Sequence, residues 1–275
     1  MNRPIAVACR TLLASAVLTA APLAAQAARP EPFKQTNIHF ETNATACDMG
    51  IQMSFDTDGL TEGEVESPHD QVVFSFRAVD GMETTDDLTE MFQERVEPPI
   101  SDLLAELDCD EPEGDPISLA ELFGAWPAGL YEFEGESGGI EFETSARLTH
   151  RIPDGPEITA PEDGAIVPHD AHLTIRWKKA TGPLLPSLGP VEIVGYHVVV
   201  ADVTEAALAP GRTKTVLDAD LSRSEATFLV PKQFLEPNRI YEFEVLATEK
   251  YGNQTITEGG VFCTLPISAS DCEAP

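Results

Sequence analysis

The sequence predicts a mixed, mainly β fold in which a β-sandwich forms the C-terminal half and a small α+β domain precedes it. Its length of 275 residues suggests two domains or one large β domain. From about Pro153 onward, short alternating segments are separated by Gly, Pro and Asn with no helical period between them, which is typical of an all-β sandwich. Before that point, both alternating and helix-period segments occur. Hydrophobic residues make up 42% of the chain, which excludes wholesale disorder.

Residues 1–27 have the pattern of a secretory signal peptide. Arg3 and Arg10 precede a short apolar run over residues 12–25, and Ala25-Gln26-Ala27 matches a cleavage site. The run is shorter than the ~20 apolar residues that span a bilayer, and no second run of spanning length follows. We therefore expect cleavage after Ala27, a mature chain without a transmembrane segment, and a periplasmic or secreted location in a bacterial host.

The acidic domain expected over residues 28–152 combines strands with short helices. The segment 86–94 places Leu88, Met91 and Phe92 at helical spacing, and the segment 101–107 has the same leucine pattern. Ser118 and Glu121 have the spacing of a helix capping box. Alternation predicts strands over 36–42, 50–56, 71–79, 130–135 and 140–152.

The domain expected over residues 153–275 contains seven predicted strands. In one of them Leu173, Ile175 and Trp177 alternate onto a single face. Seven short strands at this spacing predict a β-sandwich. They cover residues 156–161, 172–178, 193–201, 213–217, 227–230, 241–247 and 260–264.

The segment Leu235-Glu236-Pro237-Asn238-Arg239-Ile240-Tyr241 has the L-x-P-x-x-x-Y pattern of a tyrosine corner, which ties the two sheets of a sandwich together. With Trp177 on the second strand, residues 155–265 resemble a fibronectin type III domain. The resemblance implies a structural spacer or a module that contacts proteins or carbohydrates. A strand with Tyr131-Glu132-Phe133 and a strand that ends at Leu148-Thr149-His150 lead into this domain. This complete arrangement resembles a group of exported bacterial proteins of undefined role, which implies a fold and a compartment but no mechanism.

The loop over residues 181–190 is long and proline-rich for a fibronectin type III domain. Its leucines, Leu184, Leu185 and Leu188, are either an exposed contact patch or packed on the neighbouring domain, and we favour packing.

Four cysteines remain after the predicted cleavage, and an even number in an exported chain predicts two disulfides with three possible pairings. Because the domains separate them, we favour Cys47–Cys109 and Cys263–Cys272. No pair has C-x-x-C spacing and no His lies at zinc-ligand spacing, so the sequence assigns no metal centre to them.

The chain carries 47 acidic and 17 basic residues, a formal net charge of −30. Removal of Arg3 and Arg10 with the signal peptide takes this charge to −32, of which −23 lies in residues 28–152 and −9 in residues 153–275. Such an acidic chain lacks the basic surface that nucleic acid requires. We therefore expect no nucleic-acid partner.

Several local motifs are interpreted as turns. Gly135-Glu136-Ser137-Gly138-Gly139 matches the G-x-S-x-G elbow of hydrolases, but both flanks alternate as strands, which predicts a hairpin turn. Pro68-His69-Asp70 and Pro168-His169-Asp170 read as solvated loops. Asn43 and Asn253 begin glycosylation motifs that we expect to be unmodified turns in a bacterial host. The sequence assigns no catalytic and no cofactor-binding residue.

Acidic clusters offer oxygen ligands that suit Ca²⁺, but neither cluster has EF-hand spacing. The first is Asp56-Thr57-Asp58-Gly59 with Glu62, Glu64 and Glu66, and the second is Asp108-Cys109-Asp110-Glu111. Solvation by counter-ions explains the same charge, so no metal ligand is assigned.

Together, these patterns predict an exported, non-enzymatic binding or scaffolding protein that acts through contact with a protein or glycan partner. Two alternatives stay open. One is an envelope hydrolase or accessory factor that uses the carboxylates of Glu132, Glu134, Glu141 and Glu143, since two carboxylates suffice for glycoside cleavage. The other is a calcium-stabilised surface protein.

Overall fold

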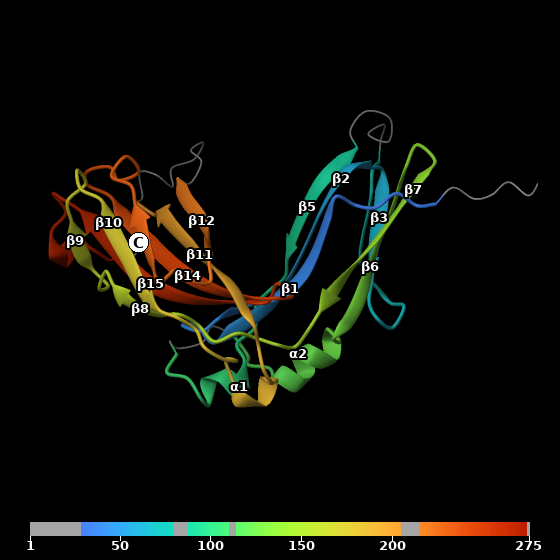
Figure 1. Ribbon diagram of the computed structural model, residues 1–275, viewed down its shortest axis with the longest axis horizontal. Coiled ribbons are helices and arrows are strands. Elements are labelled where there is room, and N and C mark those ends of the chain that lie inside the picture. Colours follow the sequence, from blue (N-terminus) through green and yellow to red (C-terminus); the bar gives the residue numbers. More distant parts are fainter. Residues whose placement is uncertain (1–28, 80–86, 110–113, 205–214, 274–275) are drawn as a thin grey trace, which may run out of the picture.

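The computed structural model describes residues 29–79, 87–109, 114–204 and 215–273 (Figure 1). The predicted signal peptide lies outside these residues. No helix among the described residues has the length and apolar character needed to cross a membrane.

An eight-stranded sheet runs through both halves of the chain (Figure 1). Its strand order is β12 (Val216–Ser222), β11 (Ile193–Asp202), β14 (Ile240–Glu249), β15 (Gln254–Thr264), β1 (Gln35–Asn43), β2 (Asp48–Leu60) and β5 (Leu88–Glu94), and β9 (Ala165–Val167) also pairs with β15. β1 and β15 pair in parallel, with Glu41 opposite Gln254 and Asn43 opposite Ile256. Hydrogen bonds of one sheet therefore cross the expected domain boundary after residue 152, and the division into two domains stays a prediction.

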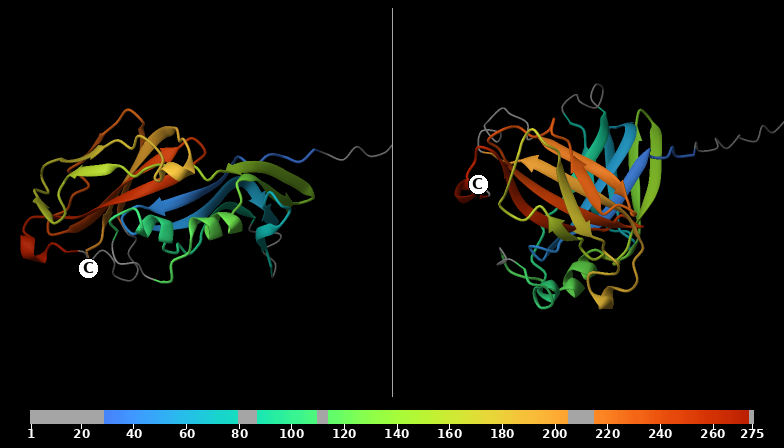
Figure 2. Two further views of the ribbon diagram at one scale, coloured as in Figure 1. Left: turned by 90° about the horizontal axis from the view of Figure 1, so that it is seen from below. Right: turned by 60° about the vertical axis from the view of Figure 1, so that its left-hand side comes forward.

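Two smaller sheets complete the architecture. One consists of β13 (Thr227–Val230), β10 (Leu173–Lys178) and β8 (Glu157–Ala160), and the other of β4 (Val72–Arg77), β3 (Glu62–Glu66), β6 (Gly129–Ser137) and β7 (Ile140–Leu148). They lie on the outer sides of the two limbs of a V, with the short helices beneath its base (Figures 1 and 2).

The two larger hydrophobic cores lie on the same face of the eight-stranded sheet. Val245 and Ala247 of β14 belong to the C-terminal core, whereas Ile38 and Phe40 of β1 belong to the N-terminal core. Side chains alternate along each strand, and the register of β14, β15 and β1 places these residues on one continuous face. The opposite face therefore lies on the inner side of the V (Figure 1), and we call it the inner face.

The predicted β-sandwich in the C-terminal half is confirmed, with β8, β10 and β13 opposite β11, β12, β14 and β15. The tyrosine corner is also confirmed, because the Tyr241 hydroxyl donates to the carbonyl of Phe234 at 3.3 Å and accepts from the Glu236 amide at 2.8 Å. Trp177 packs in the core against Tyr196. The fold is thus mainly β, with a fibronectin type III-like C-terminal half.

The N-terminal half contains fewer helices than the sequence predicts. The helix expected over 86–94 is wrong: Leu88–Glu94 is β5, an edge strand that pairs with β2. Its Met91 is half-buried on the core side, but Phe92 is 64% exposed on the inner face. Pairing with the exposed edge of β2 satisfies backbone groups over the whole segment, and this outweighs an apolar spacing of only one helical turn. β3 and β9 were not expected.

Two short helices are confirmed where the sequence predicts helical segments. They are α1 (Ser101–Leu104) and α2 (Leu119–Ala125). The capping box of α2 is present, since the Glu121 amide donates to Ser118 Oγ at 3.2 Å and the Ser118 amide donates to Glu121 Oε2 at 2.8 Å. These two hydrogen bonds satisfy amide groups that the start of a helix leaves unpaired.

The predicted cysteine pairing and the predicted packing of the leucine loop are confirmed. Cys47 pairs with Cys109 and Cys263 with Cys272, the latter pair next to the 3₁₀ turn η3 (Ala269–Asp271). Leu184 and Leu185 are buried in the N-terminal core, and the 3₁₀ turn η2 (Pro186–Leu188) follows them. These leucines join the two halves instead of forming an exposed patch.

Candidate functional site

The G-x-S-x-G motif is a hairpin turn, as predicted. Ser137 at the end of β6 pairs with Ile140 at the start of β7, and Gly138 and Gly139 between them have φ values of 59° and 83°. Two residues with positive φ are typical of a two-residue hairpin loop. Ser137 Oγ donates to Asp87 Oδ2 at 2.8 Å.

The two Pro-His-Asp motifs also lie in turns. His69 and Asp70 are exposed between β3 and β4, and Asp70 has a φ of 56°. His169 lies in the turn that connects β9 and β10. The structure does not bring the two motifs into one cluster with another metal-ligating side chain among the described residues.

The first acidic cluster, for which the sequence assigned no metal ligand, has its own counter-charge. Lys34 Nζ lies 2.7 Å from Asp58 Oδ1 and 3.5 Å from Asp56 Oδ1. In the second cluster Cys109 is bonded to Cys47, and Asp110 and Glu111 lie outside the described residues. The described part of neither cluster forms a group of three close ligands.

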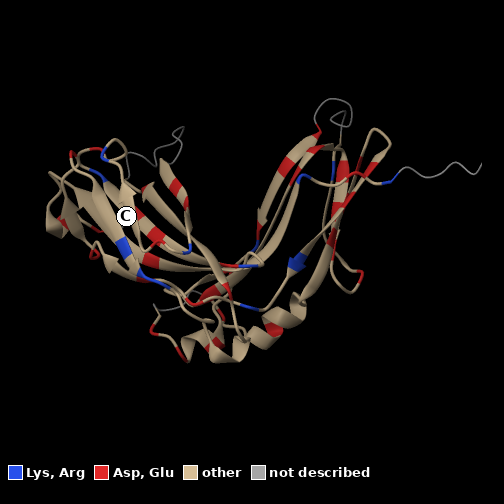
Figure 3. Cartoon of the chain, viewed as in Figure 1, with Lys and Arg blue, Asp and Glu red and all other residues tan. Residues whose placement is uncertain are grey.

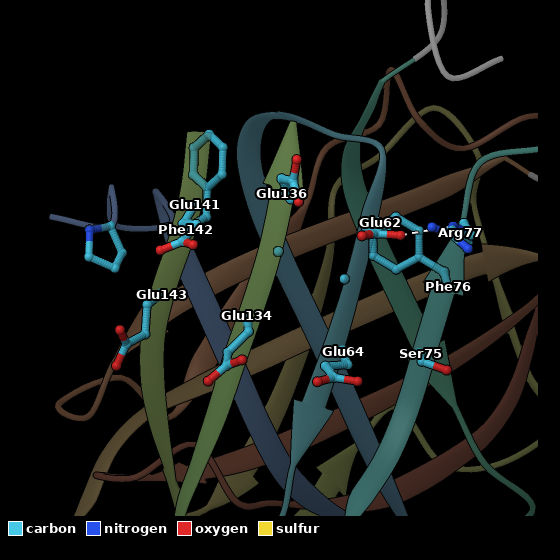
Figure 4. Close-up of a pocket in the computed structure, with 13 residues that line it drawn as sticks. Glu62, Glu64, Ser75, Phe76, Arg77, Glu134, Glu136, Glu141, Phe142 and Glu143 are labelled. Atoms are coloured by element: carbon cyan, nitrogen blue, oxygen red, sulfur yellow. Dashed lines mark ion pairs between the residues drawn. The ribbon is translucent and has the colours of Figure 1, made fainter. Parts of the chain in front are cut away.

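Glu134, Glu141 and Glu143, three of the four glutamates of the hydrolase alternative, lie in rows across the outer face of the β4–β3–β6–β7 sheet (Figure 4). The fourth, Glu132, lies outside these rows, opposite Glu66 and Ser145. Register places Glu134 between Glu64 and Glu143, and Glu136 between Glu62 and Glu141. We call these six residues the glutamate rows. They line a shallow cavity of about 570 Å³ together with Ser75 and Arg77.

The electrostatics of the glutamate rows are those of a crowded, mostly exposed acidic surface. Desolvation raises the pKa of Glu134 above its ordinary value, and the charges of Glu66 and Glu143 raise it further. Arg77 Nε pairs with Glu62 Oε2 at 2.8 Å at one margin. The rows suit attraction of positive charge.

A second acidic cluster lies on the inner face, where the sequence assigned no site. Gln52 Nε2 donates to Glu41 Oε1 at 2.7 Å and to Glu94 Oε1 at 3.2 Å, and Gln254 Nε2 also donates to Glu41. These four side chains come from β1, β2, β5 and β15. The amides thus hold two carboxylates close together.

Glu97 completes this cluster by folding over Gly50. A Cβ at position 50 would lie 2.5 Å from Glu97 Cγ, so only glycine leaves room for this side chain. Carboxylate oxygens of Glu41, Glu94 and Glu97 all lie within 4.8 Å of one another. We call these three residues the carboxylate trio. It is the only group of three candidate metal ligands at such distances among the described residues.

The trio and its neighbour Glu244 carry unusual electrostatics. Desolvation, followed by the charges of Glu41, Asp48 and Glu94, raises the pKa of Glu97 to about 8. Desolvation, with the charge of Glu41 next, raises the pKa of Glu244 to about 7. No Lys or Arg among the described residues forms an ion pair with these carboxylates. In Figure 3, the acidic positions in red outnumber the basic positions in blue along the chain.

This arrangement can accept positive charge, and sequence reasoning missed it. One signal was present: His39 and Glu41 alternate with the core residues Ile38 and Phe40, which marks a polar face on the predicted strand. The partners of Glu41 come from four other segments, which no local pattern connects.

No family model matches the chain, and no curated protein sequence matches it. Solved structures that are similar to it include fibronectin(III)-like modules of Clostridium thermocellum CbhA, with 9% identity, a TM-score of 0.29, and coverage of 85% of this chain and 97% of that chain. Domains FN1–FN3 of chicken CNTN1 give 10% identity and a TM-score of 0.27, with 85% and 62% covered. Titin domains A168–A170 have 12% identity and a TM-score of 0.25, with coverage of 82% of this chain and 64% of that chain. At these TM-scores the likeness supports no assignment of function, and the fibronectin type III-like character of the C-terminal half rests on its strand order and its tyrosine corner.

Proposed function

We propose that this chain is an exported, non-enzymatic binding or scaffolding protein that acts through protein–protein contact at its inner face. The observation that carries the proposal is the carboxylate trio: Glu41 and Glu97 are half-buried, Glu94 is exposed, and no Lys or Arg among the described residues pairs with any of them. Strongly perturbed carboxylates that are not used by the fold itself mark candidate binding sites.

The framework of the chain supports the same proposal. One hydrogen-bonded sheet carries the inner face across both halves, so its side chains keep a fixed spacing. Phe92 on β5 is 64% exposed and Val216 on β12 is 46% exposed at opposite margins of this face. Large apolar side chains that remain exposed beside a charged centre suit a protein partner.

Photocrosslinking tests the proposal. A photoreactive phenylalanine analogue replaces Phe92 in one variant and Leu229 in a control, since Leu229 is 54% exposed on β13, away from the inner face. We expect one discrete adduct from Phe92 in extract of the exported fraction, and its loss when Glu41, Glu94 and Glu97 are changed to Gln. Equal adducts at Phe92 and Leu229, or an adduct insensitive to the Gln changes, would contradict contact at this face.

The hydrolase alternative draws on one specific observation, the raised pKa of Glu134 directly opposite Glu143. A general acid needs a raised pKa and a nearby carboxylate partner. A glycan-cleaving activity of the purified chain that disappears in both Glu134→Gln and Glu143→Gln would favour this alternative over the binding proposal.

A further inference from the structure

β5 forms a free edge of the eight-stranded sheet. Among the described residues it pairs only with β2, and its outer edge has no strand beside it. Leu88, Thr89, Glu90, Phe92 and Glu94 are all exposed along it. The backbone N–H and C=O groups of such an edge are a template for a further strand from another chain.

The side chains of this edge have a definite order. Glu90, Phe92 and Glu94 lie opposite Asp56, Ser54 and Gln52 and therefore share the inner face. A strand laid beside β5 would place its own alternate side chains about 5 Å from them. The complementary pattern is basic, apolar and basic at every second position.

The carboxylate trio strengthens the basic position beside Glu94. A Lys or Arg side chain there would meet the carboxylates of Glu41 and Glu97 as well, because the oxygens of all three lie within 4.8 Å of one another. Glu97 Oε1 is buried without a hydrogen-bond partner among the described residues. A cation would supply the missing partner, and charge-assisted hydrogen bonds of this kind are stronger than neutral ones.

The net charge of the chain favours a cationic partner over a second copy at the edge of β5. A second copy would bring its own Glu90 and Glu94 to the same edge, on a chain with a formal net charge of −30. Like charges on an edge strand oppose pairing between copies, as in natural sheets that avoid self-association. A cationic segment of a different protein has the opposite charge and no such penalty.

We propose that the free edge of β5 takes up an extended, cationic segment of a partner protein as an additional strand, with basic side chains beside Glu90 and Glu94 and an apolar one beside Phe92. This inference rests on the proposed function, since it names the partner chemistry of the same face. It adds the position of the segment along β5 and the period of its side chains.

A synthetic peptide tests the inference in the mature chain. Its core, Lys-Thr-Phe-Thr-Lys, has about the length of a typical strand, which is roughly 5–6 residues. A shuffled peptide of equal composition and a peptide with methylated backbone nitrogens are the controls. We expect hydrogen exchange to slow in β5 on addition of the alternating peptide, and neither control peptide to have this effect.

Matched variants separate the edge from general charge attraction. Glu90→Gln with Glu94→Gln removes two charges from the inner face, whereas Glu132→Gln with Glu136→Gln removes two from the β6 strand of the other sheet. We expect peptide affinity to fall about tenfold in the first variant and less than about twofold in the second, since exposed charges far from the contact are screened. Gly50→Ala, which displaces Glu97, is expected to weaken binding as well.

Other results would overturn the inference. Equal loss in both double variants, or equal binding of the shuffled peptide, would mean unspecific charge attraction. A concentration-dependent dimer with slowed exchange in β5 would mean a second copy on the edge, and Ca²⁺ that binds the trio and excludes the peptide would mean a metal site. Crosslinking at Phe92 remains a separate test: an adduct whose attached segment lacks the alternating basic pattern would overturn the inference and leave the proposed function intact.

Discussion

Asn253 Oδ1 accepts a hydrogen bond from the backbone amide of Phe40 at 2.9 Å, across 213 residues of sequence. Asn253 Nδ2 donates to the carbonyls of Thr149 at 2.9 Å and of Arg151 at 3.1 Å. One side chain in the turn between β14 and β15 thus satisfies backbone groups of β1 and of the segment after β7. Asn253 is 1% exposed, so this glycosylation motif is closed to modification in the folded chain.

We predict that Asn253→Ala lowers the free energy of unfolding by about 3 kcal/mol. The change leaves the buried Phe40 amide and the Thr149 carbonyl without this partner, and an unsatisfied buried group costs about 1–3 kcal/mol. Urea unfolding followed by fluorescence measures the loss. Asn43→Ala is the control, because Asn43 Oδ1 accepts from the amides of Thr45 and Ala46 in a partly exposed turn. A similar loss in both variants would contradict the joining role of Asn253.

We predict that the two disulfides contribute unequally to stability. Cys47–Cys109 closes a separation of 62 residues and Cys263–Cys272 one of 9. Loop-closure entropy then assigns about 4 kcal/mol to the first and about 2.5 kcal/mol to the second. Paired Cys→Ser variants, compared by urea unfolding, test the order. A larger loss of unfolding free energy in the Cys263→Ser, Cys272→Ser double variant would show that loop length does not decide which disulfide stabilises more.

Structural features formed by residues that are close in sequence could be predicted. The tyrosine corner spans Leu235 to Tyr241, the capping box spans Ser118 to Glu121, and the hairpin turn needs only Gly138 and Gly139 between alternating strands. In each case the residues that form the feature are neighbours in the chain. Local chemistry alone therefore decides the structure.

The pairing of β1 with β15 and the composition of the inner face could not be predicted in this way. Glu41 meets Gln254 because β1 pairs in parallel with β15, and it meets Glu94 because β5 is a strand instead of a helix. Both facts depend on which sheet edge is available to a segment. The helical spacing of Leu88, Met91 and Phe92 gives no information about that edge, and without β5 the carboxylate trio does not exist.

We predict that Glu97→Gln reduces the loss of stability at alkaline pH. Desolvation and the charges of Glu41, Asp48 and Glu94 raise the pKa of Glu97 from 4.5 to about 8. The folded chain therefore holds this proton more tightly than the unfolded chain. This contribution to stability is complete below pH 4.5 and is lost as the pH rises to about 8.

Burial of His39 gives the opposite slope at lower pH. Desolvation lowers the pKa of His39 from 6.5 to about 4, so its contribution is present above pH 6.5 and is lost as the pH falls through 4. The two slopes cancel between pH 4.5 and 6.5, and the raised pKa of Glu244, about 7, adds a further loss as the pH rises. Thermal melting from pH 4 to pH 9 should thus show its maximum on the acidic side of neutrality and fall toward pH 8. Glu97→Gln should raise stability by about 1 kcal/mol at the alkaline end, the cost of one buried unpartnered group. Glu225→Gln, on an exposed turn, is the control; the same gain there would attribute the effect to net charge.

We predict that Glu134→Gln stabilises the chain, because it removes the central charge of the glutamate rows. Glu134 lies between Glu64 and Glu143, and like charges directly opposite each other on a sheet cost roughly 0.2–1 kcal/mol. The gain should be about 0.5 kcal/mol at pH 8 and low salt, and should shrink in 1 M salt, where the Debye length is about 3 Å. Glu62→Gln is the matched control, because it removes a charge that already pairs with Arg77, so it should give no gain. A stability that falls in Glu134→Gln would contradict the repulsion between neighbouring glutamates on which this prediction rests.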